Sequence, residues 1–108
     1  MKYYKLHLIR HGLTQGNLEG LYIGSGTDLP LCAEGRAQLK TLKKDFAYPQ
    51  VPLVFTSPMV RATETAEILF PGVRQIELQD LREMAFGKFE GQPLQQLVMD
   101  PEFAQWMD

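Results

Sequence analysis

The chain has 108 residues, a length that fits one small domain. Its composition, 44% hydrophobic and 22% charged, is that of an ordinary soluble protein. The formal net charge of −2 offers no basic surface, so we expect neither a nucleic-acid nor a membrane partner. Neither a signal peptide nor a membrane-spanning segment is recognisable at the beginning of the chain, and we therefore expect a cytoplasmic protein.

The first part of the chain is predicted to contain a strand, a loop and a helix. Residues 4–9 alternate as a strand that ends at Arg10. The glycine-rich stretch 12–27 that follows is expected to be a loop, and loops that follow strands often carry functional sites. Apolar residues at helical spacing predict a helix over 33–44.

The second part repeats the alternation of strand and helix. Residues 53–55 form a short apolar run that predicts a strand. Ser57 and Pro58 are typical of a helix N-cap and first helical position, and the proline–glycine pair at 71–72 ends that helix. Residues 73–78 alternate as a further strand. This order predicts an α/β layered fold with mainly parallel strands.

The end of the chain begins a helix that the sequence does not complete. Asp100 and Pro101 are typical of a cap and first turn, and Phe103, Trp106 and Met107 begin an apolar face. A helix cut in its second turn gains little from packing, so we interpret the sequence as a piece of a longer protein. A natural product of this length would instead need a partner or a second copy, which predicts self-association through this C-terminal region.

Arg10, His11 and Gly12 lie where the first predicted strand enters the loop. A neutral imidazole is a competent nucleophile towards phosphorus, and the planar fork of arginine suits phosphate oxygens. A glycine after the histidine lets the backbone approach a ligand closely. By themselves these residues are also consistent with an ordinary arginine and histidine at the end of a strand, without a catalytic role.

Two further positions, Arg61 and Glu83, are candidates for binding a phosphate and for transferring a proton. Arg61 lies one turn into the helix that follows residues 53–55, near an N-terminus whose free N–H groups favour anions. The alternative is a surface arginine paired with Glu64 or Glu67. Glu83 lies among apolar residues that could partly desolvate its carboxyl group and suit it to protonate a leaving oxygen. The alternative there is an ordinary solvated glutamate.

Taken together, these segments resemble the histidine phosphatase (phosphoglycerate mutase-like) superfamily. Residues 10–17, Arg-His-Gly-Leu-Thr-Gln-Gly-Asn, resemble the R-H-G-x-T-x-x-N signature of that family. The similarity continues in the same order through three further segments, which are residues 28–35, 57–66 and 83–91. The match covers about residues 6–97. It implies a three-layer α/β/α fold with a mostly parallel sheet, of which residues 1–108 would be the N-terminal portion of a single domain.

The resemblance also implies a role for each matching residue. His11 would accept the phosphoryl group as a phosphohistidine, and Glu83 would protonate the leaving oxygen and then activate water. The remaining residues would bind the phosphate of a small phosphorylated metabolite: Arg10 and Arg61 as a clamp, with Asn17 and Thr14 as added donors. Because two arginines supply the charge stabilisation, the mechanism needs no metal and no cofactor.

Within the superfamily, the loop favours a phosphatase over a phosphoglycerate mutase. Mutases usually carry N-R-F-T-G-W after the loop asparagine, and here Leu21 and Ser25 stand in place of the arginine and the tryptophan. The segment 83–91 resembles the alpha-ribazole phosphatase and broad-specificity phosphatase branch. Loss of basic residues removes contacts that would hold a substrate carboxylate or a released bisphosphate, so hydrolysis is the favoured reaction and the mutase the alternative.

Two features depart from the family pattern. The family uses a second histidine in a later G-H-G-like motif, whereas this chain has only His7 and His11, about 13 Å apart on an extended strand. We therefore expect the chain alone to hydrolyse phosphate esters poorly, and a catalytically silent phosphate-binding module is the second alternative. Cys32 stands where the family has threonine or serine, and we expect it to cap the next helix poorly, at about 1 kcal/mol.

Overall fold

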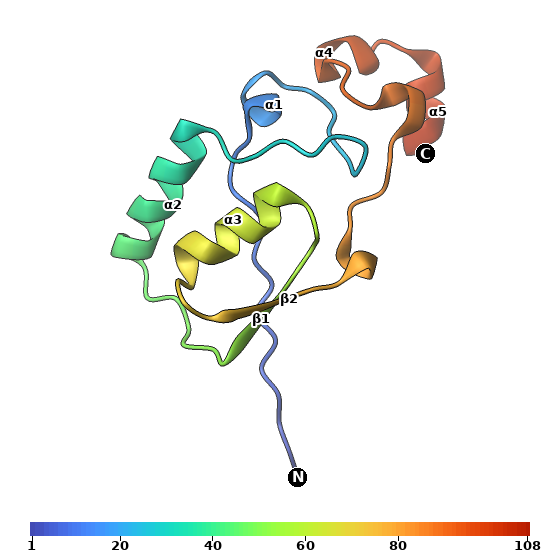
Figure 1. The fold of residues 1–108 in the computed structure, drawn as a ribbon. Coiled ribbons are helices and arrows are strands. Elements are labelled where there is room, and N and C mark those ends of the chain that lie inside the picture. Colours follow the sequence, from blue (N-terminus) through green and yellow to red (C-terminus); the bar gives the residue numbers. More distant parts are fainter.

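The computed structural model describes residues 1–108 and is built around a parallel pair of strands (Figure 1). β1 (Leu53–Thr56) pairs with β2 (Arg74–Glu77), with Leu53 opposite Arg74 and Thr56 opposite Glu77. α3 (Val60–Leu69) connects the two strands, as a parallel pair requires. The predicted α/β class with a parallel sheet is confirmed, as are the strands expected near 53–55 and 73–78.

The first of two small cores lies between α2 (Ala33–Asp45) and α3. α2 confirms the helix predicted over 33–44, and it packs against α3 (Figure 1). Leu31, Leu39 and Leu69 are buried together at this contact, because the apolar stripe of each helix faces the other. This core supports the loop that carries His11.

The second core lies in the C-terminal part of the chain. The short helical elements there are η1 (Gln79–Leu81), η2 (Gly87–Phe89), α4 (Leu94–Leu97) and α5 (Pro101–Met107). Phe89, Leu97 and Phe103 form its buried centre. Asp100 accepts a hydrogen bond from the Glu102 N–H at 2.8 Å with Pro101 at the first helical position, so the predicted start of α5 is confirmed. None of the helices has the length and apolar character needed to cross a bilayer.

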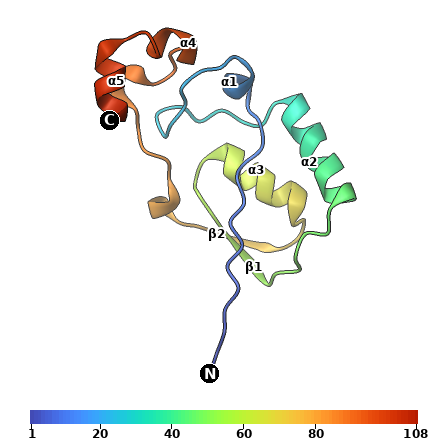
Figure 2. The same cartoon turned by 180° about the vertical axis from the view of Figure 1, so that it is seen from behind.

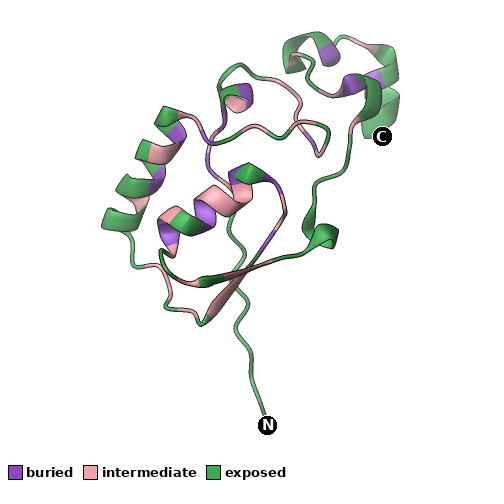
Figure 3. Ribbon diagram, in the orientation of Figure 1, coloured by how far each residue is buried: buried purple, intermediate pink, exposed green.

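The strand predicted over residues 4–9 is wrong. Residues 1–13 belong to no helix or strand, and no backbone–backbone hydrogen bond involves residues 1–12. The N-terminal end of this segment projects from the body in both views (Figures 1 and 2), and its apolar side chains are exposed there, Tyr4 by 88% and Leu8 by 87% (Figure 3). A strand needs a partner for its N–H and C=O groups, and β1 and β2 pair only with each other here.

The predicted start of α3 is displaced by two residues. The helix begins at Val60, after Met59 as N-cap, and the Ser57 hydroxyl instead accepts a hydrogen bond from the Met59 N–H at 3.3 Å. The carboxylate of Asp28 accepts from the Val60 N–H at 2.8 Å. The cap is therefore supplied by a residue far away in the sequence, which local reasoning about Ser57 could not detect.

Candidate active site around His11

His11 lies at the junction of the N-terminal segment and the loop that follows it, and its side chain is half-buried. Its Nδ1 lies 2.6 Å from the Gly12 carbonyl oxygen. A carbonyl can only accept a hydrogen bond, so Nδ1 carries the proton and Nε2 keeps its lone pair. Burial lowers the pKa of His11; the Gly12 hydrogen bond opposes this, whereas the charges of Arg61 and Arg10 lower the pKa further. The imidazole is thereby kept neutral and nucleophilic.

Thr65 anchors this histidine to α3. The Thr65 hydroxyl donates to the Arg61 carbonyl oxygen at 2.7 Å and accepts from the Gly12 N–H at 2.9 Å. Gly12 also packs so tightly on Leu39 that an added Cβ would meet that side chain at 2.8 Å. Sequence reasoning gave Thr65 no role, although its position one helical turn after Arg61 could have suggested that both face the loop.

Arg61 is a buried cation without a carboxylate partner. Its side chain comes from the first turn of α3, and the residue is only 4% exposed. Its guanidinium donates to the carbonyl oxygens of Thr27 at 2.8 Å and Gly24 at 3.2 Å. The alternative of a surface pair with Glu64 or Glu67 is wrong, because Glu64 pairs with Arg36 on α2. A buried charge without a counter-ion is costly and is typical of an anion-binding site.

Arg10 and Glu83 lie within electrostatic reach of His11 and are both exposed. Arg10 lowers the pKa of His11 and Glu83 raises it, although burial has the largest influence. The expected desolvation of Glu83 is not found: its carboxylate is exposed and accepts a hydrogen bond from the Met84 N–H at 3.1 Å. The structure thus brings the charges of Arg10, Arg61 and Glu83 to the neighbourhood of His11.

Thr14 and Asn17 form a capping box at α1 (Gln15–Leu18), a one-turn helix within the segment predicted as loop. The Thr14 hydroxyl donates to Asn17 Oδ1 at 3.0 Å, and the same hydroxyl accepts from the Asn17 N–H at 3.2 Å. Thr14 is fully buried and its single hydroxyl proton is already donated, so the geometry does not support it as a phosphate donor. Asn17 Oδ1 accepts from the Thr14 N–H at 2.9 Å as well, and the Asn17 amide N–H groups donate to no acceptor within the chain.

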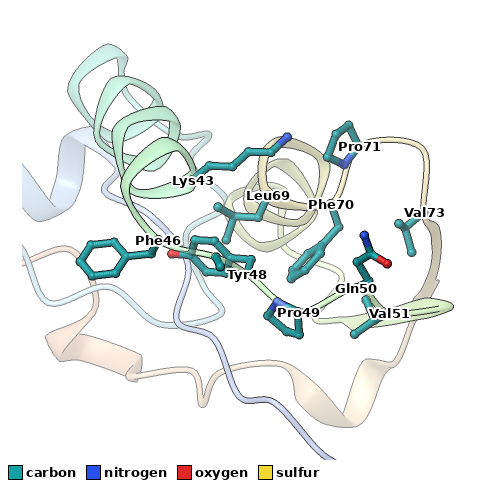
Figure 4. A pocket seen from close by; sticks show the side chains of 11 residues that line it. Lys43, Phe46, Tyr48, Pro49, Gln50, Val51, Leu69, Phe70, Pro71 and Val73 are labelled. Atoms are coloured by element: carbon teal, nitrogen blue, oxygen red, sulfur yellow. The ribbon is translucent and has the colours of Figure 1, made fainter.

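A cavity of about 360 Å³ lies away from these residues, at the C-terminal ends of α2 and α3 (Figure 4). Tyr48 and Phe70 are among the side chains that line it, and none of the predicted site residues does. No group of three or more His, Cys, Asp or Glu side chains is arranged to hold a metal ion.

The family model and the similar proteins found by comparison all indicate one family. Residues 6–108 match the model described as "Histidine phosphatase superfamily (branch 1)". The uncharacterized phosphatase PhoE of Bacillus subtilis is 37% identical over 82% of the chain and 47% of its own length. The adenosylcobalamin/alpha-ribazole phosphatase of Salmonella typhimurium is 39% identical over 80% of the chain and 43% of its own length. The chain therefore spans about half the length of the curated relatives it matches.

Solved structures show the same relation. The crystal structure of TTHB049 from Thermus thermophilus aligns with 92% of this chain and 54% of its own at a TM-score of 0.73 and 39% identity. A score and an identity of this size indicate a shared fold for the segments that hold His11, Arg61 and Glu83.

Proposed function

The chain belongs to the histidine phosphatase superfamily, and on this basis we propose that it acts as a phosphomonoesterase whose phosphoryl group passes through His11. One observation carries the proposal: a neutral imidazole with a free Nε2 lies within electrostatic reach of the buried Arg61 guanidinium, which has no carboxylate partner. The nucleophile and the charge that would bind its phosphate are both prepared before any substrate arrives.

The proposed reaction has two steps. In the first, the lone pair of His11 Nε2 forms a bond to phosphorus as the ester P–O bond breaks, and the leaving oxygen takes the proton held by the Glu83 carboxyl group. In the second, Glu83 takes a proton from water while the water oxygen attacks phosphorus, which releases inorganic phosphate and restores His11. Arg61 and Arg10 neutralise the phosphate oxygens, and Asn17 donates a further hydrogen bond.

Hydrolysis is favoured over phosphoryl transfer within a phosphoglycerate. Leu21 and Ser25 occupy the loop positions where mutases usually carry an arginine and a tryptophan. Neither side chain can bind a carboxylate through charge, so a second acidic group on the substrate has no cation to hold it there. We propose a small phosphorylated metabolite as the substrate and a cytoplasmic place of action.

The experiment that tests the proposal looks for the covalent intermediate. The purified chain is treated with a reactive aryl phosphate, and its intact mass is measured under alkaline conditions, in which a phosphohistidine survives. We expect one added phosphoryl group, located on His11 by peptide mapping and lost in His11→Ala. His7→Ala is the matched control, because His7 is exposed and distant from the site; it should keep the label.

Two results would contradict the proposal. Labelling that persists in His11→Ala would place the nucleophile elsewhere. Saturable phosphate binding that needs Arg61 but never yields a phosphohistidine would identify the catalytically silent binding module instead of an enzyme.

A further inference from the structure

Two side chains of opposite charge hold the loop of residues 24–27. Arg61 binds the carbonyl oxygens of Gly24 and Thr27. Glu90 Oε2 binds the other polar groups of the same residues: it accepts from the Gly24 N–H at 2.8 Å and from the Thr27 hydroxyl at 2.7 Å. The carboxylate and the guanidinium do not touch, so any influence of Glu90 on Arg61 passes through this loop.

Glu90 is ionised in spite of its position. Burial raises its pKa, but hydrogen bonds from Gly24, Thr27, Phe86 and Gly26 together lower the pKa below its ordinary value of 4.5. No lysine or arginine pairs with it. A carboxylate held by several N–H and O–H donors without a cation is bound to the loop itself and not to a neighbouring charge.

The same carboxylate joins the loop to the segment that follows Glu83. Glu90 Oε1 accepts from the Phe86 N–H at 3.2 Å, and the Ser25 N–H donates to the Met84 carbonyl oxygen at 3.1 Å. Contact here is close, because a Cβ on Gly24 would lie 2.1 Å from the Met84 oxygen. Glu90 and the backbone hydrogen bond between Ser25 and Met84 therefore hold the loop together against the segment that begins at Glu83.

We propose that Glu90 is a positioning residue for the phosphate site: by holding Gly24 and Thr27 in place, its carboxylate keeps the Arg61 guanidinium where it can bind a phosphate oxygen. The inference rests on the proposed function, since it assigns Arg61 to phosphate. Glu90 itself does not touch the phosphate. We expect the loss of Glu90 to lower the affinity for phosphate through Arg61, and to leave His11 as the nucleophile.

The test measures inorganic phosphate binding and the state of Arg61 in the full chain. Glu90→Gln removes the negative charge, and its amide offers one acceptor oxygen where the carboxylate has two. At least one of the donors on Gly24, Thr27 and Phe86 is therefore left without a partner, and the hydrogen bonds that remain are no longer charge-assisted. We expect phosphate binding to weaken about tenfold, the size of effect typical of losing a charge-assisted hydrogen bond. The Arg61 side-chain signal in the ¹⁵N NMR spectrum should shift and broaden as the guanidinium loses its defined position.

Glu67→Gln is the matched control, because Glu67 is an exposed carboxylate on α3, the helix of Arg61, with no polar contact in the structure. It should leave both the affinity for phosphate and the Arg61 signal unchanged. If Glu90→Gln fails to fold, Thr27→Val removes only the hydroxyl that donates to Glu90 and keeps the carbonyl that Arg61 binds. We expect about a threefold loss of phosphate affinity in that variant.

The outcomes separate this inference from the proposed function. A folded Glu90→Gln chain with the wild-type Arg61 signal and affinity would overturn the role of Glu90. Wild-type affinity in Thr27→Val would overturn it equally if Glu90→Gln cannot be studied. A wild-type chain that binds no phosphate would contradict the proposed function alone, because the Arg61 signal still reports whether Glu90 positions the guanidinium.

Discussion

His11 and its neighbour Gly12 determine which nitrogen of the imidazole can react. The Gly12 carbonyl holds the Nδ1 proton, and Thr65 holds Gly12 to α3. The histidine therefore keeps an unprotonated Nε2, in a ring whose pKa is lowered chiefly by burial. Arg61 is buried without a carboxylate partner, and in the proposed reaction its charge would neutralise the phosphate beside this nucleophile.

The first prediction concerns the titration of His11. Its pKa lies below the ordinary value of 6.5 because of burial, with Arg61 and Arg10 lowering it further. The unfolded chain therefore takes up this proton first as the pH falls, and the stability contributed at His11 decreases below pH 6.5 and is restored above it. NMR titration of the ring should give a midpoint below 6.5, and Arg61→Ala should raise that midpoint.

Assignment of the ring signal by its loss in His11→Ala provides the control for this titration. A wild-type midpoint at or above 6.5 would show that the imidazole is more hydrated, or nearer to a carboxylate, than in the structure.

At the scale of the elements, α2 is held to the His11 loop by its first turn. Cys32 occupies the N-cap position of α2: its Sγ accepts from the Gly35 N–H at 3.4 Å and donates to the Leu13 carbonyl oxygen at 3.4 Å, whereas the cost of about 1 kcal/mol expected for a cysteine cap stays a prediction. The thiol thus joins the helix to the loop as well as capping it. Gly35 comes so close to the loop that an added Cβ would meet the Leu13 oxygen at 2.2 Å.

Gly35→Ala therefore tests a competition between helix propensity and packing. Alanine is the better helix former by roughly 0.5–1 kcal/mol, but the clash with the Leu13 backbone costs about 1–3 kcal/mol. We expect a net loss of unfolding free energy and, because Leu13 follows Gly12 directly, weaker phosphate binding. Chemical denaturation measures the first effect and phosphate titration the second. A stabilised Gly35→Ala chain would mean that α2 lies farther from the loop than in the structure.

On the scale of the whole molecule, two small cores support the site, and much apolar surface stays open. The N-terminal segment exposes its tyrosines and leucines, and Met99 and Trp106 are exposed by 82% and 43%. Exposed apolar surface of this kind suits a further layer of protein. Self-association through the C-terminal region stays a prediction.

The last prediction concerns turnover. The resemblance implies a second histidine in the phosphate pocket, and this chain offers only His7, which is exposed on the projecting N-terminal segment. We expect the purified 108-residue chain to hydrolyse a generic aryl phosphate slowly or not at all, even where His11 takes up a phosphoryl group. Steady turnover that His11→Ala abolishes would contradict this, and would show that the pocket is completed from elsewhere.

Local patterns in the sequence predicted α2, β1, β2 and the start of α5, because helical and strand spacing and the cap at Asp100 act over a few neighbouring residues. The roles of His11, Glu83, Arg10 and Arg61 came from the family resemblance, and they stay predictions. Residues 4–9 were predicted wrongly for the complementary reason: alternation indicates that a segment can pair as a strand, but not that a partner is present.

The sequence by itself determined the family, the α/β class and the candidate residues His11, Arg61 and Glu83. Only the tertiary structure decided that Arg61 is buried without a carboxylate, that Thr65 holds the His11 loop, and that Glu90 binds the same loop of residues 24–27 as Arg61. In the hydrogen bonds responsible, donor and acceptor are separated along the sequence by 34, 37, 53 and 66 positions. Such partners are brought together by the packing of helices and loops, and they cannot be predicted from the spacing of neighbouring residues.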